Sequence, residues 1–499
     1  MITDNETKQA FPFLDDNNDR LALTIGEEQV TYAALNQRIN DVAAKLLKGG
    51  GDLREERIAM IIPPSLDYVT LLFAIWRAGG IAIPLNINAV IGELEHYLVS
   101  TGATQLIVSD QLNGDIASLC AQHGVDHQLF TDVESMPILN ANLPSLDVSR
   151  RAMILFTSGT TNKPKGVVST HSNIHSQILS LLEAWEWQKA DCIPLFLPMH
   201  HVHGIINILC CGLWAGATID VFTQFDIETL LPKVTEDTYT LFMAVPTIYA
   251  KLISYLEGMS AGEKEKVCNG FRHMRLNVSG SAACPIPIYE KWLALTEQVL
   301  LERYGMTEIG MAISNPYRGE RRAGAVGVPL PGVEVALFDE KQQRVSTEGV
   351  PGEIRIKGKT VFLEYWGNKS ATEESFVDGW FCTGDVAVVE NGYYRIMGRS
   401  SIDIIKSGGF KISALEIEGV LLSHDEILEC AVIGVPDPIW GEAVTAVVVL
   451  APGSSIDDVA LKEWCTGKMS SYKIPKSLRV VDSLPRNAMG KVTKTLLQK

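Results

Sequence analysis

The residues best suited to chemistry lie in segment 154–171, ILFTSGTTNKPKGVVSTH, where an apolar run meets a small, hydroxylated, glycine-rich turn. Glycines let backbone N–H groups approach phosphate oxygens closely, hydroxyl groups add donors, and lysines add positive charge. The segment supplies all three kinds of group: Thr157, Ser158, Gly159, Thr160, Thr161, Lys163, Lys165 and Gly166. This composition predicts a polyphosphate-binding loop. The alternative is a surface loop that is simply rich in Ser, Thr and Gly.

The spacing of this loop is not that of a P-loop. A P-loop has a glycine, four further residues and then Gly-Lys-Ser/Thr, whereas Pro164 stands five residues after Gly159. No Ser or Thr follows a Gly-Lys pair in this segment. We therefore expect a nucleotide to be held here in a different way.

Three more places carry residue types that suit a nucleotide. Residues 303–308, RYGMTE, combine an aromatic face, a hydroxyl and a carboxylate, which suit adenine, phosphate and Mg²⁺. Asp385 could accept hydrogen bonds from both hydroxyls of a ribose, although taken alone a turn aspartate after Gly384 is the simpler interpretation. Lys491 stands on a glycine turn near the C-terminus, where a lysine is usually just solvated.

The elements around these residues alternate in a way that predicts an α/β fold. From Arg57 onward, short apolar runs alternate with helical patterns, which favours a largely parallel sheet as far as about residue 325. Residues 333–399 instead show strand-like alternation, and Asn391-Gly392 predicts a hairpin, which together are typical of a smaller antiparallel element. The glycine-containing segment that follows is a candidate hinge into a last domain of about 100 residues.

Composition limits the kinds of partner. The chain has 499 residues, of which 46% are hydrophobic, so it can bury a large core in two or more domains. Its net charge of −16 argues against nucleic acid or an anionic membrane as the main partner. The longest apolar stretch, residues 202–219, is broken by three glycines, so we expect a buried helix and turn and no membrane span.

The cysteines and the N-terminal stretch both bear on the cellular compartment in which the protein is expected. Nine cysteines stand without any C-x-x-C pair, which favours a reducing compartment, and the adjacent Cys210 and Cys211 suit a core. The N-terminal stretch lacks both the apolar run of a signal peptide and the Arg-rich character of a transit peptide. The cytoplasm is therefore the expected location.

Taken in order, the motifs resemble the acyl-adenylate-forming family, which contains acyl-CoA synthetases, adenylation domains and luciferases. The matching motifs are TSGTTNKPKG, SGSAA (279–283), RYGMTE, TGD, the Gly-Arg pair before the hinge and the terminal Gly-Lys. The resemblance covers nearly the whole chain. It implies a two-step ligase: a carboxylate and ATP give an acyl adenylate and pyrophosphate, and a thiol then displaces AMP.

The resemblance also implies a domain plan. A large N-terminal domain, 1–398, would contain parallel α/β layers and a small antiparallel β subdomain at about 330–398. A hinge at 399–410, turning at Ser401, Ile402 or Asp403, would lead to a mobile α+β lid domain, 411–499. This lid is expected to rotate between the two steps. The expected assembly is a monomer or a homodimer.

Site residues carry over from the family one by one. The ATP- and AMP-binding residues implied are Thr157, Ser158, Gly159, Thr160, Thr161, Lys165, Ser279, Gly280, Ser281, Ala282, Tyr304, Gly305, Thr307, Asp385 and Arg399. In this set, 157–165 would hold the β- and γ-phosphates, 279–283 and Tyr304 would frame the adenine, and Asp385 and Arg399 would hold the ribose.

The same resemblance implies the catalytic groups. Lys491 would bridge the carboxylate and the α-phosphate, Thr307 would touch the α-phosphate, and Glu308 would support Mg²⁺. Coenzyme A is the expected thiol, and its pantetheine arm would pass Lys406, Gly408 and Gly409. Mg²⁺ is therefore the expected cofactor, and ATP and coenzyme A are the expected co-substrates.

The identity of the acid is predicted from Arg303. Many family members have a small residue at this place in the acyl pocket, and a guanidinium there disfavours a hydrocarbon chain and favours a second carboxylate. His203, at the place of the family's pocket histidine, and Ser279 complete the predicted substrate-binding set. Residues 301–335 also resemble the malonyl-CoA synthetase branch of the family. We expect malonate as substrate, with methylmalonate tolerated if one methyl group fits.

Several alternatives remain open from the sequence. Arg303 could pair with Glu302 or Glu308, which would leave a ligase for a short or medium monocarboxylate. His200, His201 and His203 could form a metal cluster, although no fourth ligand is evident. The chain could also load a carrier protein instead of coenzyme A, or carry out a luciferase-like oxygenation, which a pocket arginine disfavours.

Overall fold

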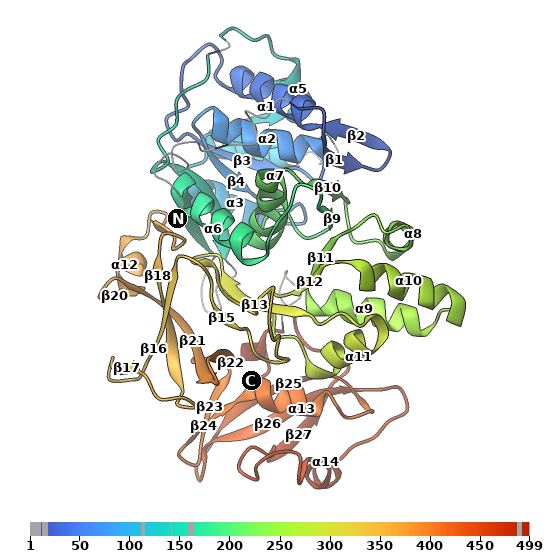
Figure 1. The fold of residues 1–499 in the computed structure, drawn as a ribbon. Helices are drawn as coiled ribbons and strands as arrows, with labels where there is room; N and C mark the ends of the chain where they lie inside the picture. The colour runs from blue at the N-terminus through green and yellow to red at the C-terminus, as the bar shows by residue number, and fades with distance from the viewer. Residues whose placement is uncertain are drawn as a thin grey trace.

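The computed structural model describes residues 11, 18–110, 115–140, 142–157, 164–486 and 492–498. Figure 1 shows α/β layers along the first two-thirds of the chain, a β-rich subdomain against them, and a C-terminal domain, coloured orange to red, at one end. Of the predicted site residues, Ser158, Gly159, Thr160, Thr161 and Lys491 lie outside the described residues, as does Lys163.

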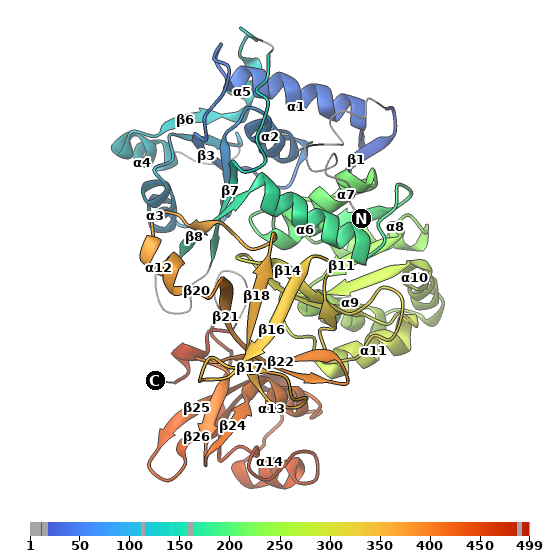
Figure 2. The same cartoon turned by 60° about the vertical axis from the view of Figure 1, so that its left-hand side comes forward.

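The first part is a seven-stranded sheet. Its strands are β3 (Arg57–Ile61), β4 (Ile81–Pro84), β5 (Gln105–Val108), β6 (Asp126–Leu129), β7 (Arg151–Thr157), β8 (Lys165–Thr170) and β19 (Glu364–Tyr365). The strand order is β19-β8-β7-β4-β3-β5-β6. Strands β3 to β7 pair in parallel, whereas β8 turns back antiparallel on β7. Figure 2 shows the late segment around β19 lying beside β8, with which it pairs.

Helices cover this sheet. They are α1 (Tyr32–Leu46), α2 (Leu66–Arg77), α3 (Ile91–Thr101), α4 (Asp115–His123), α5 (Phe130–Ser135) and α6 (His171–Ala184). Helix α2 begins after Ser65, whose side chain accepts a hydrogen bond from the Tyr68 amide as an N-cap. Helix α2 buries nearly every residue, from Tyr68 to Trp76, which explains its almost continuous apolar sequence.

A second α/β part carries the segments around RYGMTE. Its five-stranded sheet contains β11 (Leu241–Ala244), β12 (Leu276–Ser279), β13 (Leu301–Met306), β14 (Gly310–Ser314) and β15 (Val328–Pro329). Its helices are α8 (Ile227–Thr235), α9 (Pro246–Glu257), α10 (Ala261–His273) and α11 (Ile286–Thr296). Strands β12 and β13 are parallel, with Ser279 opposite Glu302. This register brings the turn after Ser279 next to Arg303.

A four-stranded sheet, β2-β1-β10-β9, lies beside these layers. Its strands are β1 (Leu21–Ile25), β2 (Glu28–Thr31), β9 (Cys192–Leu195) and β10 (Thr218–Val221). Between β9 and β10 the chain forms the π-helix η3 (His203–Cys210) and the helix α7 (Cys211–Ala215). Residues 202–219 therefore form the buried helix and turn expected from the sequence, but the first half is a π-helix, a form often found at functional sites.

The antiparallel subdomain was also expected. Its strands are β16 (Val333–Phe338), β17 (Arg344–Val345), β18 (Gly352–Gly358), β20 (Phe376–Val377), β21 (Trp380–Glu390) and β22 (Tyr393–Arg399), with one helix, α12 (Lys369–Glu374). Asn391 and Gly392 join β21 to β22 with φ of 49° and 77°. Positive φ at both positions explains the Asn-Gly pair, and the predicted hairpin is confirmed.

The C-terminal domain is a sheet with order β24-β23-β26-β25, with β27 beside β26. Its elements are β23 (Ile404–Ser407), β24 (Phe410–Ser413), α13 (Ala414–Leu421), β25 (Ile427–Asp437), β26 (Gly441–Leu450), α14 (Asp458–Cys465), β27 (Ser477–Val480) and η4 (Lys494–Leu496). The sheet already begins at β23, before the predicted boundary at residue 411. Much of the predicted hinge segment is thus strand, and only 400–403 connect β22 to β23.

Lys494 ties the C-terminal tail to this connection. Its Nζ atom lies 2.6 Å from a carboxylate oxygen of both Asp403 and Glu418, and its side chain is buried. The tail segment that follows residues 487–491 is therefore anchored against the connection between the domains.

Cys210, Cys211 and the long apolar stretch that contains them were also expected to be buried in the core. Cys210 and Cys211 have no exposed surface, and all nine cysteines, each of them among the described residues, are free thiols. Within the described ranges, no helix combines the length and the apolar character needed to cross a membrane.

Candidate active site

The predicted phosphate loop lies between β7 and β8. Thr157, the last residue of β7, is the register partner of Lys165, the first residue of β8. The Lys165 Nζ atom lies 4.7 Å from the centre of the Tyr365 ring. Residues 158–163 of the loop lie outside the described residues. The structure therefore locates only the two ends of the loop, with the hydroxyl of Thr157 at one end and the cation of Lys165 at the other.

Tyr304, Asp385 and Arg399 meet at one place. The Tyr304 hydroxyl donates to Oδ2 of Asp385 at 2.6 Å, and Nε of Arg399 donates to Oδ1 at 3.1 Å. Asp385 and Arg399 face each other on β21 and β22. Burial, and then the charge of Asp385, hold the pKa of Tyr304 well above its ordinary value. The predicted adenine and ribose residues are thus brought together, with the carboxylate fixed by two donors.

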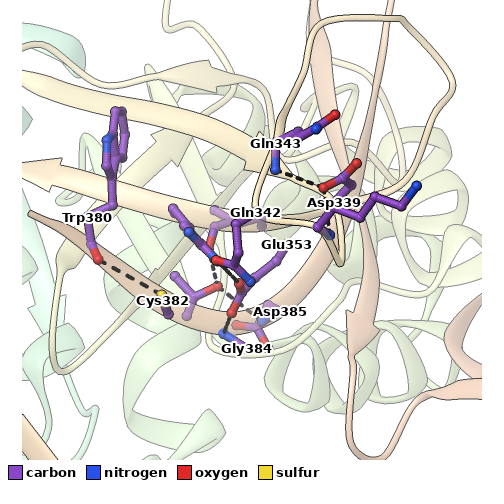
Figure 3. A network of polar contacts seen from close by, with 12 residues as sticks. Asp339, Gln342, Gln343, Glu353, Trp380, Cys382, Gly384 and Asp385 are labelled. Carbon is purple, nitrogen blue, oxygen red and sulfur yellow. Dashed lines mark hydrogen bonds and ion pairs between the residues drawn. The ribbon is translucent and has the colours of Figure 1, made fainter. Parts of the chain in front are cut away.

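The turn before Asp385 is held from the neighbouring strand. Figure 3 shows Glu353, from β18, beside Gly384, whose amide donates to Oε1 of Glu353 at 3.2 Å. The amide of Asp385 itself donates to the hydroxyl of Thr383 at 3.1 Å. These bonds to neighbouring groups fix the backbone that presents the Asp385 carboxylate.

Glu308 follows Thr307 in the turn between β13 and β14. Its Oε1 atom accepts a 2.9 Å hydrogen bond from the Tyr365 hydroxyl, whereas its buried Oε2 atom has no hydrogen-bond partner among the described residues. Burial raises the pKa of Glu308, and the nearby positive charges of Arg399 and Lys165 lower it in part. A buried carboxylate oxygen that has no partner among the described residues, and that lies close enough to Lys165 for its charge to act on the carboxyl, suits a hard cation such as Mg²⁺.

Arg303 is a second buried charged residue near this place. Only 5% of its surface is exposed, and burial lowers its pKa to about 9, so it is still a cation at neutral pH. In the described part of the chain, its Nε and Nη2 atoms have no hydrogen-bond partner. Glu302 accepts from the Gly324 amide and Glu308 accepts from Tyr365. The predicted alternative of an internal ion pair with either glutamate is therefore not found among the described residues.

His203 lies close to this guanidinium. It begins the π-helix η3, is 5% exposed, and its Nδ1 atom lies 3.2 Å from the Ser281 hydroxyl. Burial, and then the charges of Arg303 and His201, hold its pKa well below its ordinary value. His203 is therefore neutral at physiological pH.

The alternative of a histidine metal cluster is not supported. The rings of His200 and His201 lie 4.1 Å apart, and burial lowers the pKa of His200 to about 4. Nowhere in the described ranges do three or more His, Cys, Asp or Glu side chains form a group that could hold a metal ion.

Two residues of the 279–283 turn, which was predicted to frame the adenine, lie against Arg303 and His203, the residues predicted for the acyl pocket. Ser281 contacts His203, and Gly280 lies against the guanidinium of Arg303. Ser279 is buried at the end of β12, and Ala282 is exposed. The sequence motif located this turn but not the direction of its side chains, because a motif contains no information about what packs against it.

The predicted coenzyme A residues lie at the exposed end of the C-terminal sheet. Gly408 and Gly409 form the β23–β24 turn with φ of 58° and 85°, and the Lys406 amide donates to Glu442 at 2.6 Å. A Cβ atom at Gly408 would lie 3.1 Å from the ring of Trp440, which is 42% exposed. Sequence reasoning did not select Trp440 or Tyr365, since neither belongs to a recognised motif.

Family comparisons agree with this geometry. Residues 13–366 match the AMP-binding enzyme family, and residues 416–491 match the AMP-binding enzyme C-terminal domain. The chain belongs to the AMP-binding enzyme family. Both clusters described above, at Asp385 and at Glu308, contain residues of the motifs through which the sequence resembles adenylate-forming enzymes.

A curated relative of this AMP-binding enzyme is the mitochondrial malonate–CoA ligase of Bos taurus. The two sequences are 40% identical over an alignment of 517 positions, which covers 95% of this chain and 87% of the relative. ATP-bound MatB from Rhodopseudomonas palustris has a similar structure, with a TM-score of 0.90 and 33% identity over 99% of this chain and 98% of that chain.

A malonyl-CoA ligase in a ternary product complex with methylmalonyl-CoA and AMP is similar as well. Its sequence is also 33% identical, over 95% of this chain and 100% of that chain, but the TM-score is 0.70. Two proteins at equal sequence identity thus differ in how well their whole structures superpose on this AMP-binding enzyme.

Proposed function

We propose that this AMP-binding enzyme is a malonate–CoA ligase, which activates malonate with ATP and transfers the malonyl group to coenzyme A. The observation that carries the proposal is Arg303, a buried cation in the acyl region whose Nε and Nη2 atoms have no partner among the described residues. Relatives named malonate–CoA ligases at 40% identity support it.

The chemistry has two steps. One malonate carboxylate oxygen attacks the α-phosphorus of ATP, a P–O bond forms, and the bond to pyrophosphate breaks. The deprotonated thiol of coenzyme A then attacks the acyl carbon, a C–S bond forms, and AMP leaves with the electron pair of the C–O bond. Thr307 and Lys491 are proposed to stabilise charge at the α-phosphate in the first step, where preorganised donors are most effective.

Arg303 explains why a diacid is the substrate. A monocarboxylate would leave the guanidinium buried without a counter-ion, which is costly, whereas the second carboxylate of malonate can pair with it bidentately. Removal of one partner of such a buried pair typically costs about 3–5 kcal/mol. We therefore expect malonate to be preferred over an equally short monoacid by at least about a hundredfold, or 2.7 kcal/mol. Methylmalonate is tolerated if the pocket accepts one methyl group.

Glu308 is the residue proposed to hold Mg²⁺, through its Oε2 atom. The bound ion would neutralise charge on the phosphates. Tyr365 orients the carboxylate through Oε1. The Nζ atom of Lys165, 4.7 Å from the centre of the Tyr365 ring, is the cation expected beside the β- and γ-phosphates.

The arrangement of the domains is proposed to be the one used for adenylation. The TM-score is 0.90 with an ATP-bound neighbour and 0.70 with a product complex that contains a CoA thioester and AMP, both at 33% identity. A rotation of the C-terminal domain about residues 400–403 between the two steps accounts for this difference.

The test is AMP release that depends on ATP and coenzyme A, measured with acetate, butyrate, octanoate, oxalate, malonate, methylmalonate and succinate at equal enzyme concentration. The expected result is a kcat/KM for malonate at least about a hundredfold above that for any monoacid. Preference for a monoacid would contradict the substrate assignment. Turnover only with a carrier protein would contradict the role of coenzyme A. The cytoplasmic location and the monomeric or homodimeric state stay predictions.

A further inference from the structure

The guanidinium of Arg303 lies directly over the backbone of Gly280. A Cβ atom at Gly280 would come within 2.4 Å of both Nε and Cζ of Arg303, and within 2.8 Å of Nη1. Real Cβ atoms do not make contacts this short, so the present position of the guanidinium requires glycine at 280. Because the clashing atoms belong to the end of a long side chain, a methyl group there would move Arg303 and not the β-strand.

Ser281, the next residue, has an unusual backbone conformation. Its φ is 68°, in the left-handed region that residues with a Cβ atom rarely adopt. Such conformations cost about 1–3 kcal/mol and persist where the surrounding structure over-determines them, frequently at functional sites. The conformation places the Ser281 hydroxyl 3.2 Å from Nδ1 of His203.

The hydroxyl of Ser281 can determine which nitrogen of His203 carries the proton. His203 is neutral, so it has one N–H group, and its buried Nε2 atom has no hydrogen-bond partner among the described residues. If Ser281 donates to Nδ1, the proton must reside on Nε2, which then becomes a donor. Only this tautomer favours an anion, because an unprotonated Nε2 would direct a lone pair at it.

We propose that the Gly280-Ser281 turn is a specificity-determining device for the second carboxylate of the substrate. Gly280 leaves room for the Arg303 guanidinium, and Ser281 is a positioning residue that keeps His203 as an Nε2–H donor toward the same carboxylate. The inference rests on the proposed function, since it assigns the acyl pocket to a diacid. Gly280 and Ser281, which were expected to frame the adenine, are thereby given a role in discriminating diacids from monoacids.

The first test is Gly280→Ala, with Gly262→Ala as the matched control. Gly262 lies on α10, where a Cβ atom would meet nothing within 4 Å. In Gly280→Ala, the ratio of kcat/KM for malonate to that for butyrate is expected to fall at least about tenfold, or 1.4 kcal/mol, while the KM for ATP stays within about twofold. The control should keep both values. An unchanged ratio in a folded Gly280→Ala protein would overturn the role of Gly280.

The second test is a double-mutant cycle with Ser281→Ala and His203→Gln, where the amide nitrogen of glutamine takes the place of Nε2–H. If Ser281 acts through the tautomer of His203, Ser281→Ala raises the KM for malonate about five- to thirtyfold, but adds little to His203→Gln. A merely structural serine would give additive effects, and additivity would overturn the proposal. This arm remains decisive if Gly280→Ala does not fold.

The acid panel and the variants of this turn separate a wrong substrate from a wrong role of Gly280 and Ser281. If the wild-type enzyme does not prefer malonate in the acid panel, the proposed function is wrong. If the wild type prefers malonate, but Gly280→Ala and Ser281→Ala keep that preference, the proposed function stands and the role of this turn is wrong.

Discussion

The phenolic hydroxyl of Tyr365 donates a 2.9 Å hydrogen bond to Oε1 of Glu308, although the two residues lie 57 positions apart in the chain. Strand β19 pairs with β8, and this pairing places Tyr365 near the end of the predicted phosphate loop. The centres of the Phe362 and Tyr365 rings lie 4.8 Å apart. With Oε1 occupied, Oε2 is the oxygen of Glu308 that the proposed Mg²⁺ ion would contact. Residues that orient a metal ligand in this way typically contribute a factor of about 10–100 to affinity.

Tyr365→Phe should therefore raise the Mg²⁺ concentration that gives half-maximal adenylation by about tenfold, because the ring packing stays and only the orienting hydroxyl is lost. The measurement is the rate of pyrophosphate release at saturating ATP and malonate as Mg²⁺ is varied. Tyr394→Phe is the control, since the Tyr394 hydroxyl makes only a 3.4 Å contact with the Val335 carbonyl. An unchanged Mg²⁺ requirement in Tyr365→Phe would argue against Glu308 as the ligand.

Arg303→Ala should lower kcat/KM for malonate by about a thousandfold, which corresponds to about 4 kcal/mol of transition-state stabilisation. ATP affinity should be almost unchanged, because Arg303 forms no hydrogen bond with the described residues that are proposed to bind the nucleotide. Arg318→Ala is the control: this arginine is 78% exposed and pairs with Glu186 at the surface. Malonate kinetics like those of the wild type in Arg303→Ala would refute the diacid assignment.

Lys491→Ala should abolish the formation of malonyl adenylate but leave the transfer of a supplied malonyl adenylate to coenzyme A. The reason is that the proposed charge stabilisation by Lys491 is needed only while the α-phosphate is attacked. The two half-reactions are measured separately, with Lys369→Ala, at an 87% exposed side chain, as the control. An equal loss in both half-reactions would be incompatible with domain rotation between the steps.

Glu302→Gln should change the pH dependence of stability. Burial raises the pKa of Glu302 to about 7, against an ordinary value of 4.5, so the folded state holds this proton more tightly than the unfolded state. The contribution of Glu302 is therefore fully present below pH 4.5 and is lost as the pH rises through 7, by about 3 kcal/mol in total.

The measurement is the free energy of unfolding in urea at pH 5, 6, 7 and 8. As the pH rises across this range, the free energy of unfolding of the wild type should fall relative to that of Glu302→Gln. This change with pH is the result that counts, and a constant difference in stability between the two proteins does not affect it. Glu297→Gln, at a 69% exposed side chain, should parallel the wild type. Parallel curves for the wild type and Glu302→Gln would show that Glu302 is ionised in both states.

Much of the fold follows from local sequence signals. Ser65 marks the start of α2 because its hydroxyl satisfies a free amide, and Asn391-Gly392 marks a hairpin because both residues tolerate positive φ. These effects act within a few residues, so they can be recognised in a sequence. Glycines at 408 and 409 contributed to the predicted hinge segment, but they form a tight turn between paired strands. The predicted turning residues, Ser401, Ile402 and Asp403, lie in the connection between β22 and β23.

The sequence by itself determined the order of the motifs, the α/β class and the residue types available for nucleotide and acid binding, because each depends on composition and short-range spacing. Only the tertiary structure decided which oxygen of Glu308 has no partner among the described residues, that Arg303 is not paired with Glu302 or Glu308, and that Gly280 and Ser281 lie against Arg303 and His203. These relationships join β12, β13, η3 and β19, which are distant in the chain. They are fixed by strand register and packing, which no local pattern encodes.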